Sequence, residues 1–172
     1  MSRAFSLIEL MIVIVIIGVI YTISVGSLKK IGSTSEIKLN LENLNENLLK
    51  INYNENIELL CLDDCKICKI LVDDIVFKSI DTFLDRSVLT YNYNFYSGLE
   101  MKNQKIYFDS EGITQDVCFS YMLDAQGVGD QIIVEYKDKA YDFTSYLQPT
   151  LIYNSLEDAL EKKENLIQEI LR

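Results

Sequence analysis

FSLIELMIVIVIIGVIYTI, residues 5–23, is the stretch that decides how this chain is built. The residues in it that are not clearly apolar or aromatic are Ser6, Glu9, Gly18 and Thr22. As an α-helix these 19 residues extend about 28 Å, close to the thickness of the hydrocarbon core of a bilayer. The run is longer than a typical signal-peptide core, and no small-residue cleavage site follows it. We therefore expect a retained membrane-spanning helix over residues 5–25 rather than a core helix, which normally keeps a polar face.

Glu9 interrupts the apolar run, and an ionised carboxylate in hydrocarbon is costly unless it reaches the headgroups or finds a partner. It lies four residues after Phe5, which follows the short basic leader MSRA at residues 1–4. This order of leader, Phe5, Glu9 and unbroken apolar helix resembles the prepilin signature of type IV pilins and type II secretion pseudopilins. That family normally has glycine immediately before the cleaved bond, whereas this chain has Ala4, the next smallest residue.

The resemblance implies processing and assembly. A prepilin peptidase would cut between Ala4 and Phe5 on the cytoplasmic side, and the new amine of Phe5 would be N-methylated, which keeps its positive charge. Glu9 of one subunit would then neutralise the Phe5 amine of a neighbour and set the register of assembly, because an unpaired charge in a low dielectric is far costlier than a paired one.

The same resemblance implies partners and a location. The implied partners are the prepilin peptidase, other pilin or pseudopilin subunits and the inner-membrane assembly platform. The chain would cross the cytoplasmic membrane once, with its N-terminus in the cytoplasm and its head in the periplasm. From there it would be built into a pilus or pseudopilus.

The residues after the span indicate a bend and then a second helix. Glycine and serine between residues 26 and 35 weaken the helical signal, and Ser33 with Glu36 forms a capping-box pattern. Apolar residues then recur at intervals of three and four, at Ile37, Leu41, Leu44, Leu48 and Ile51. We expect residues 26–54 to form the second half of a long stalk helix, docked on a sheet through its C-terminal part.

Residues 55–172 are expected to form an extracytoplasmic head rich in β-structure. Short β-branched or aromatic runs predict strands over 57–61, 67–72, 75–79, 88–96, 105–109, 116–123, 131–136 and 140–144. The turns at 126–130 and 137–139 predict two consecutive antiparallel hairpins. Alternating tyrosine and asparagine at 91–96 predict one aromatic face, which we expect to pack on the stalk helix.

After Pro149 the pattern becomes helical again, with Asn154 or Ser155 as the cap. The apolar residues on one face of this helix are Leu156, Leu160, Ile167 and Ile170. We expect it to cover a sheet edge or an opening of the core. The predicted fold class is therefore α+β, with a stalk helix inserted in the membrane by its first half, an antiparallel sheet head and a C-terminal helix.

The four cysteines are Cys61, Cys65, Cys68 and Cys118. If the head lies outside the cytoplasm, its compartment is oxidising and an even count favours disulfides. We expect Cys118 to pair with one member of the cluster and the other two to pair locally, and the spacing leaves open which member that is. The alternatives are a four-thiolate zinc site and a redox C-x-x-C motif at Cys65 and Cys68.

Composition excludes several classes of function. Lys+Arg is 16 and Asp+Glu is 26, and the net charge of -10 disfavours binding to nucleic acid. The absence of histidine excludes Ser-His and Cys-His nucleophile pairs and mixed Cys/His zinc sites. The chain contains neither a glycine-rich phosphate loop nor a nucleophile elbow. The acidic pairs at 63–64 and 73–74 are expected to be solvated turn residues rather than a calcium site.

We therefore expect a structural subunit, a minor pilin or pseudopilin, with no catalytic residue, no cofactor and no bound metal. It would serve a type IV pilus, a type II secretion system or a competence pseudopilus. The alternative is a membrane-tethered extracytoplasmic domain that uses its four cysteines for metal binding or redox chemistry.

Overall fold

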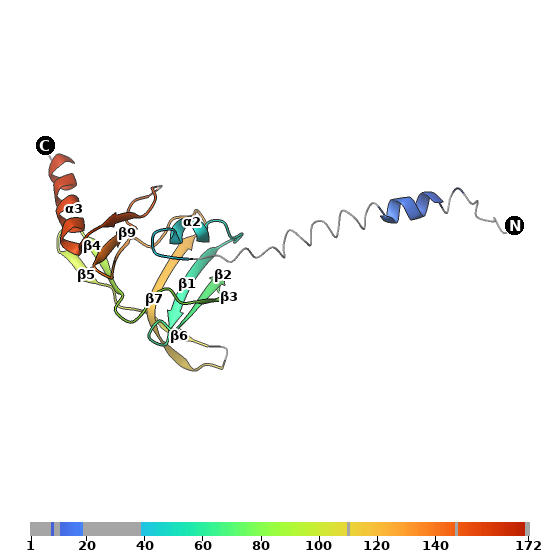
Figure 1. The fold of residues 1–172 in the computed structure, drawn as a ribbon, viewed down its shortest axis with the longest axis horizontal. Helices are drawn as coiled ribbons and strands as arrows, with labels where there is room; N and C mark the ends of the chain where they lie inside the picture. The colour runs from blue at the N-terminus through green and yellow to red at the C-terminus, as the bar shows by residue number, and fades with distance from the viewer. Residues whose placement is uncertain (1–7, 9–10, 19–38, 110, 147, 171–172) are drawn as a thin grey trace. The chain divides into compact units, whose positions relative to one another are not determined.

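The computed structural model describes Ile8 and residues 11–18, 39–109, 111–146 and 148–170 (Figure 1). The chain divides into two compact units, Met1–Lys38 and Leu39–Arg172. In the first unit Ile8 and residues 11–18 are helical, in agreement with the helix expected there. The rest of that expected span, the leader and the expected bend lie outside the described residues. None of the helices in the described ranges is both long and apolar enough to cross a bilayer.

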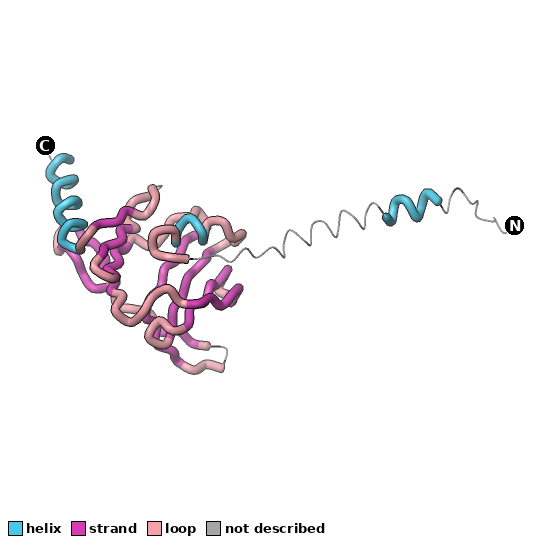
Figure 2. The backbone as a smooth tube through the Cα atoms, in the orientation of Figure 1, coloured by secondary structure: helices cyan, strands magenta, loops and turns pink. Residues whose placement is uncertain are grey.

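The second unit contains two five-stranded antiparallel sheets (Figure 2). Sheet A has the order β3-β2-β1-β7-β6. Its strands are β1 (Asn56–Leu62), β2 (Ile67–Val72), β3 (Ile75–Asp81), β6 (Ile106–Phe108) and β7 (Thr114–Asp124). The central strand β1 is buried over Ile57–Leu62, which explains why its sequence is apolar at every position there except Glu58 rather than alternating.

Sheet B has the order β10-β9-β8-β4-β5. Its strands are β4 (Leu89–Asn94), β5 (Gly98–Met101), β8 (Ile132–Tyr136), β9 (Lys139–Asp142) and β10 (Leu151–Tyr153). Every predicted strand is present, and β5 and β10 are additional. The strand predicted over 88–96 ends at Asn94, because residues 95–97 form a turn that leads directly into β5.

The hairpin predicted across the 126–130 turn is wrong, because β7 lies in sheet A and β8 in sheet B. The carboxylate of Asp124 accepts hydrogen bonds from the N–H groups of Gln126 and Val128, and Gly127 has a φ of 79°. These contacts close the turn so that the chain leaves one sheet and enters the other. The hairpin predicted between β8 and β9 is confirmed.

The helix expected over residues 26–54 is mostly absent from its described part. Between residues 39 and 54 only α2 (Leu44–Leu48) is α-helical. Asn40 and Asn43 give the physical reason, because each side chain accepts the backbone N–H of the other, at 2.9 and 3.0 Å. Such side-chain bonds compete with helical hydrogen bonds. The apolar positions predicted from the spacing are nevertheless buried in the second unit at Leu41, Leu44 and Leu48.

The C-terminal helix α3 (Leu156–Ile170) is confirmed, and Ser155 caps it by accepting the N–H of Asp158. It packs on sheet B next to β9 and β10, and Ala159 is fully buried against Ile133 and Ala140. Tyr93 of β4 packs against the same cluster. The prediction that the tyrosine face packs on the stalk helix is therefore wrong, since the helix that it meets is α3.

The core of the second unit includes a contact between residues of the two sheet regions. Tyr121 of β7 and Phe143, which follows β9, have ring centroids 4.8 Å apart. Both rings are buried, with Tyr121 only 1% exposed. Burial raises the pKa of the Tyr121 hydroxyl, so this group stays neutral under all physiological conditions.

Candidate functional site: the cysteine-linked loop and the N-terminal segment

The four cysteines form two disulfides within the described residues. Cys65 is bonded to Cys118, which is 53 residues away, and Cys61 is bonded to Cys68. This is one long-range and one local bridge, the arrangement that the sequence favoured, and the structure selects Cys65 as the partner of Cys118. Cys61 and Cys68 lie directly opposite each other in the register of β1 and β2. The bridges therefore join β1, β2 and β7 covalently.

The pairing speaks against the redox alternative. A redox C-x-x-C motif joins its own two cysteines, but Cys65 and Cys68 each bond to a different partner. The four-thiolate zinc site is also disfavoured, because all four sulfurs are in disulfide bonds.

The turn that carries Cys65 has left-handed backbone at Asp63, Asp64 and Cys65, with φ of 51°, 53° and 63°.

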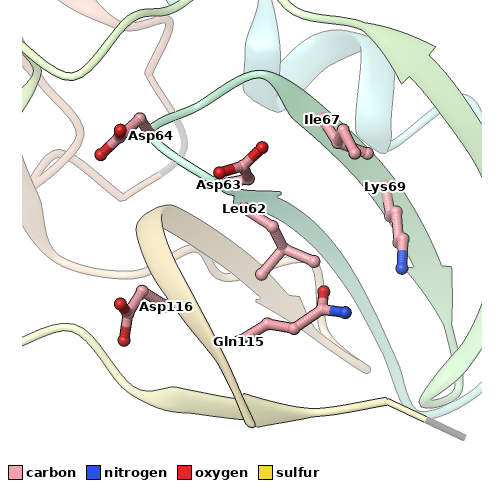
Figure 3. Close-up of a pocket in the computed structure, with 7 residues that line it drawn as sticks. All are labelled: Leu62, Asp63, Asp64, Ile67, Lys69, Gln115 and Asp116. Carbon is pink, nitrogen blue, oxygen red and sulfur yellow. The ribbon is translucent and has the colours of Figure 1, made fainter. Parts of the chain in front are cut away.

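A shallow hollow of about 500 Å³ lies beside this turn (Figure 3). Its lining residues are Leu62, Asp63, Asp64, Ile67, Lys69, Gln115 and Asp116. The three carboxylates are spread around the hollow instead of converging on one point, and Asp63 pairs with Lys66 at 3.5 Å. Within the described ranges no group of three or more cysteine or carboxylate side chains is placed to hold a metal ion.

Asp73 has a structural role that the sequence did not indicate. Its Oδ1 atom accepts the backbone N–H groups of Glu55 at 2.7 Å and of Asn56 at 3.2 Å, and its carboxylate also binds Asn54. These hydrogen bonds, with that from Glu55 the largest, lower the pKa of the Asp73 carboxyl group. The carboxylate thus fixes the chain where it enters β1, and its neighbour Asp74 remains exposed as expected.

A half-buried ion pair joins β1 to the chain before β6, since Glu58 is buried and the side chain of Lys105 is 49% exposed. Glu58 is 4% exposed, and Lys105 donates a hydrogen bond to its Oε2 atom at 2.5 Å. Burial raises the pKa of the Glu58 carboxyl group, and Lys105 acts in the opposite direction. The ammonium group therefore holds the chain before β6 against the centre of sheet A. Both residues look like ordinary surface charges in the sequence.

The N-terminal segment exposes apolar side chains on every side. Ile8, Met11 and the side chains over 12–17 are between 48% and 68% exposed. Residues 11–17 cover about two helical turns, so the exposed positions include every direction around the helix axis. A helix of this kind needs an apolar surrounding, either lipid or other apolar helices.

The comparison with known families adds the decisive observation for this segment. A family model described as the prokaryotic N-terminal methylation motif matches residues 1–24. The chain carries a type IV pilin-like prepilin motif. No curated protein and no solved structure gives a significant match to the chain.

The match covers residues 1–24, and it supports an N-terminus of the pilin or pseudopilin type, which a prepilin peptidase processes. The residues to which the resemblance gave roles, Ala4, Phe5 and Glu9, lie inside the matched range but outside the described residues. The prepilin motif and the cysteine-linked loop belong to different units of the chain.

Proposed function

We propose that this protein is a structural minor pilin or pseudopilin, held in the cytoplasmic membrane by residues 5–25 and then built into a filament. The observation that carries the proposal is the prepilin motif at residues 1–24. The apolar exposure of residues 11–17 supports it, because such a helix requires lipid or a bundle of similar helices. The two disulfides support a head that folds in an oxidising compartment outside the cytoplasm.

The role of the chain in the filament is structural rather than catalytic. Its partners are the prepilin peptidase, neighbouring pilin or pseudopilin subunits and the assembly platform of the inner membrane. In the assembled bundle Glu9 neutralises the N-terminal amine of Phe5 in the next subunit, since neither charge is stable alone in hydrocarbon. The filament belongs to a type IV pilus, a type II secretion system or a competence pseudopilus.

Processing is tested by the intact mass of the protein extracted from membranes of its producing cells. The expected mass lacks Met1 to Ala4 and carries one methyl group on Phe5. Cells without prepilin peptidase serve as the control and should yield the full-length chain. A full-length N-terminus in cells with active peptidase would contradict the proposal.

The role of Glu9 is tested separately with Glu9→Val. This variant should insert into the membrane at least as well as the wild type, because a carboxylate has been removed from hydrocarbon. It should fail to crosslink to other subunits, because the Phe5 amine has lost its partner. Glu9→Asp is the matched control that keeps the charge. Wild-type crosslinking in Glu9→Val would show that Glu9 does not set the register.

A further inference from the structure

Helix α3 covers only part of the outer face of sheet B. Tyr93 and Leu99 are directly paired across β4 and β5, and both pack against the cluster that α3 covers. Met101 lies two residues beyond Leu99 on the same side of β5 and is 63% exposed. Beyond Tyr93 and Leu99, this face is therefore left uncovered at Met101.

The position of α3 is fixed by Lys163. Its ammonium group pairs with the buried carboxylate of Asp142 at 2.9 Å and lies 5.3 Å from the centre of the Tyr93 ring. The side chain of Lys163 is only 14% exposed. This contact holds the middle of α3 on sheet B. The fold therefore fixes the position of the surface groove beside the helix.

A groove of about 440 Å³ runs between the second half of α3 and the β4–β5 turn. The hairpin contributes Tyr93, Phe95 and Tyr96 to it, and α3 contributes Leu160, Glu164 and Ile167. Phe95 is 55% exposed and Tyr96 is 93% exposed, an unusual exposure for two adjacent aromatic residues. The three helical residues are spaced by four and three, so they form one stripe along α3.

The charges on α3 beside this groove are mainly negative, which favours a positively charged binding partner. Glu164 is exposed and belongs to none of the ion pairs seen among the described residues. The acidic residues of α3 are Glu157, Asp158, Glu161, Glu164 and Glu169. Of its two basic residues, Lys163 is already bound to Asp142, which leaves Lys162. A second copy of this chain would bring the same acidic helix to the groove and would be repelled.

We propose that this groove binds a basic amphipathic helix of a different protein, which lies beside α3 over β4 and β5. Its apolar residues fill the space between Tyr96 and Ile167, and a lysine or arginine pairs with Glu164. A helix fits better than a strand, because the open space continues the helical layer that α3 begins on this face. A strand would instead add to the free edge of β5 and leave the stripe on α3 uncovered.

The test is site-specific photocrosslinking of the full chain in its producing cells, with p-benzoylphenylalanine in place of Tyr96. The control carries the same group in place of Tyr146, which is 64% exposed and lies outside the groove. Irradiation should give one adduct from position 96 and none of the same mass from position 146. Peptide mapping of the adduct should place the crosslink in a helical segment of the partner that contains lysine or arginine.

Glu164→Lys should lower the yield of this adduct about five- to tenfold, as expected when one desolvated charge pair becomes a repulsion. Lys162→Glu is the matched control on the same helix and should leave the yield unchanged. Replacing the mapped basic residue of the partner by glutamate should restore the adduct with Glu164→Lys. Intact mass reports processing independently, so failure here is distinguishable from failure of the proposed function.

Several outcomes would overturn the proposal. They are an adduct with a second copy of this chain, an equal adduct from position 146, an adduct that survives Glu164→Lys, and no adduct from position 96. A mapped partner segment without a basic residue would overturn it as well.

Discussion

The carboxylate of Asp73 controls how the chain enters its central strand, through hydrogen bonds from the backbone of Asn54, Glu55 and Asn56. The sequence showed Asp73 and Asp74 as an acidic pair in a turn, and that much is correct. The partners could not be predicted, because they lie just before β1 and at its first residue, and they reach the turn only when β1 and β2 have paired. Side-chain bonds between distant loops leave no periodic signal in a sequence.

Asp73→Asn should lower the free energy of unfolding at neutral pH. It should also make that free energy depend less on pH in the acidic range. The pKa of Asp73 is lower in the folded state than in the unfolded state. Its contribution to stability is therefore fully present above the unfolded-state pKa of about 3.9, and it is lost as the pH falls through the folded-state pKa. Urea denaturation of the full chain, followed by tyrosine fluorescence from pH 7 to pH 3, measures this. Asp74→Asn is the control and should follow the wild type. A variant Asp73→Asn with unchanged acid dependence would contradict the assignment.

The sequence predicts the secondary-structure elements best where they are long and regular. β1, β2 and α3 were predicted within two residues, since each has a clear pattern and clear ends. α2 was predicted as part of a longer helix, because the apolar spacing was correct but Asn40 and Asn43 bond to each other's backbone. The placement of β7 and β8 in different sheets was missed, because turn residues do not reveal which strand the next one joins.

Lys163→Met tests how α3 is held. Methionine keeps most of the apolar stem but leaves the buried Asp142 carboxylate without its cation. The free energy of unfolding should fall by about 3–5 kcal/mol, as for other broken buried pairs. Urea denaturation of the full chain in mild detergent measures the change. Lys162→Met, at the exposed neighbour, should cost less than about 0.5 kcal/mol. Equal losses from the two variants would show that the pair does not hold α3.

At the scale of the whole molecule, the N-terminal residues indicate the kind of protein and the head residues do not. Residues 1–24 match a family model, because membrane insertion and processing act on local sequence. The two disulfides could be predicted as one long and one short bridge, but choosing Cys65 for Cys118 required the strand order β2-β1-β7. The groove beside α3 could not be predicted, since it forms between segments about 70 residues apart in sequence.

The two disulfides should differ in their contribution to stability. Replacing Cys65 and Cys118 together by alanine frees a loop of 53 residues and should lower the free energy of unfolding by about 4 kcal/mol. Replacing Cys61 and Cys68 together frees a loop of 7 residues and should cost about 2 kcal/mol from loop entropy. Thermal unfolding monitored by circular dichroism compares the two. Equal losses, or stability that depends on added zinc, would contradict the disulfide assignment.

The bridge between Cys65 and Cys118 has a mechanical consequence. Tension applied to the two ends of the head follows the backbone to Cys65 and crosses directly to Cys118, and the bridge between Cys61 and Cys68 adds a second short path from Cys61 to Cys65. The chain from Cys68 to Cys118 therefore carries no load and cannot be drawn out while the bridges are intact. About 180 Å of contour length is withheld in this way, at the usual reach of an extended chain. A subunit pulled from a membrane by its N-terminus would thus keep its three central strands joined even after the rest of the head had given way.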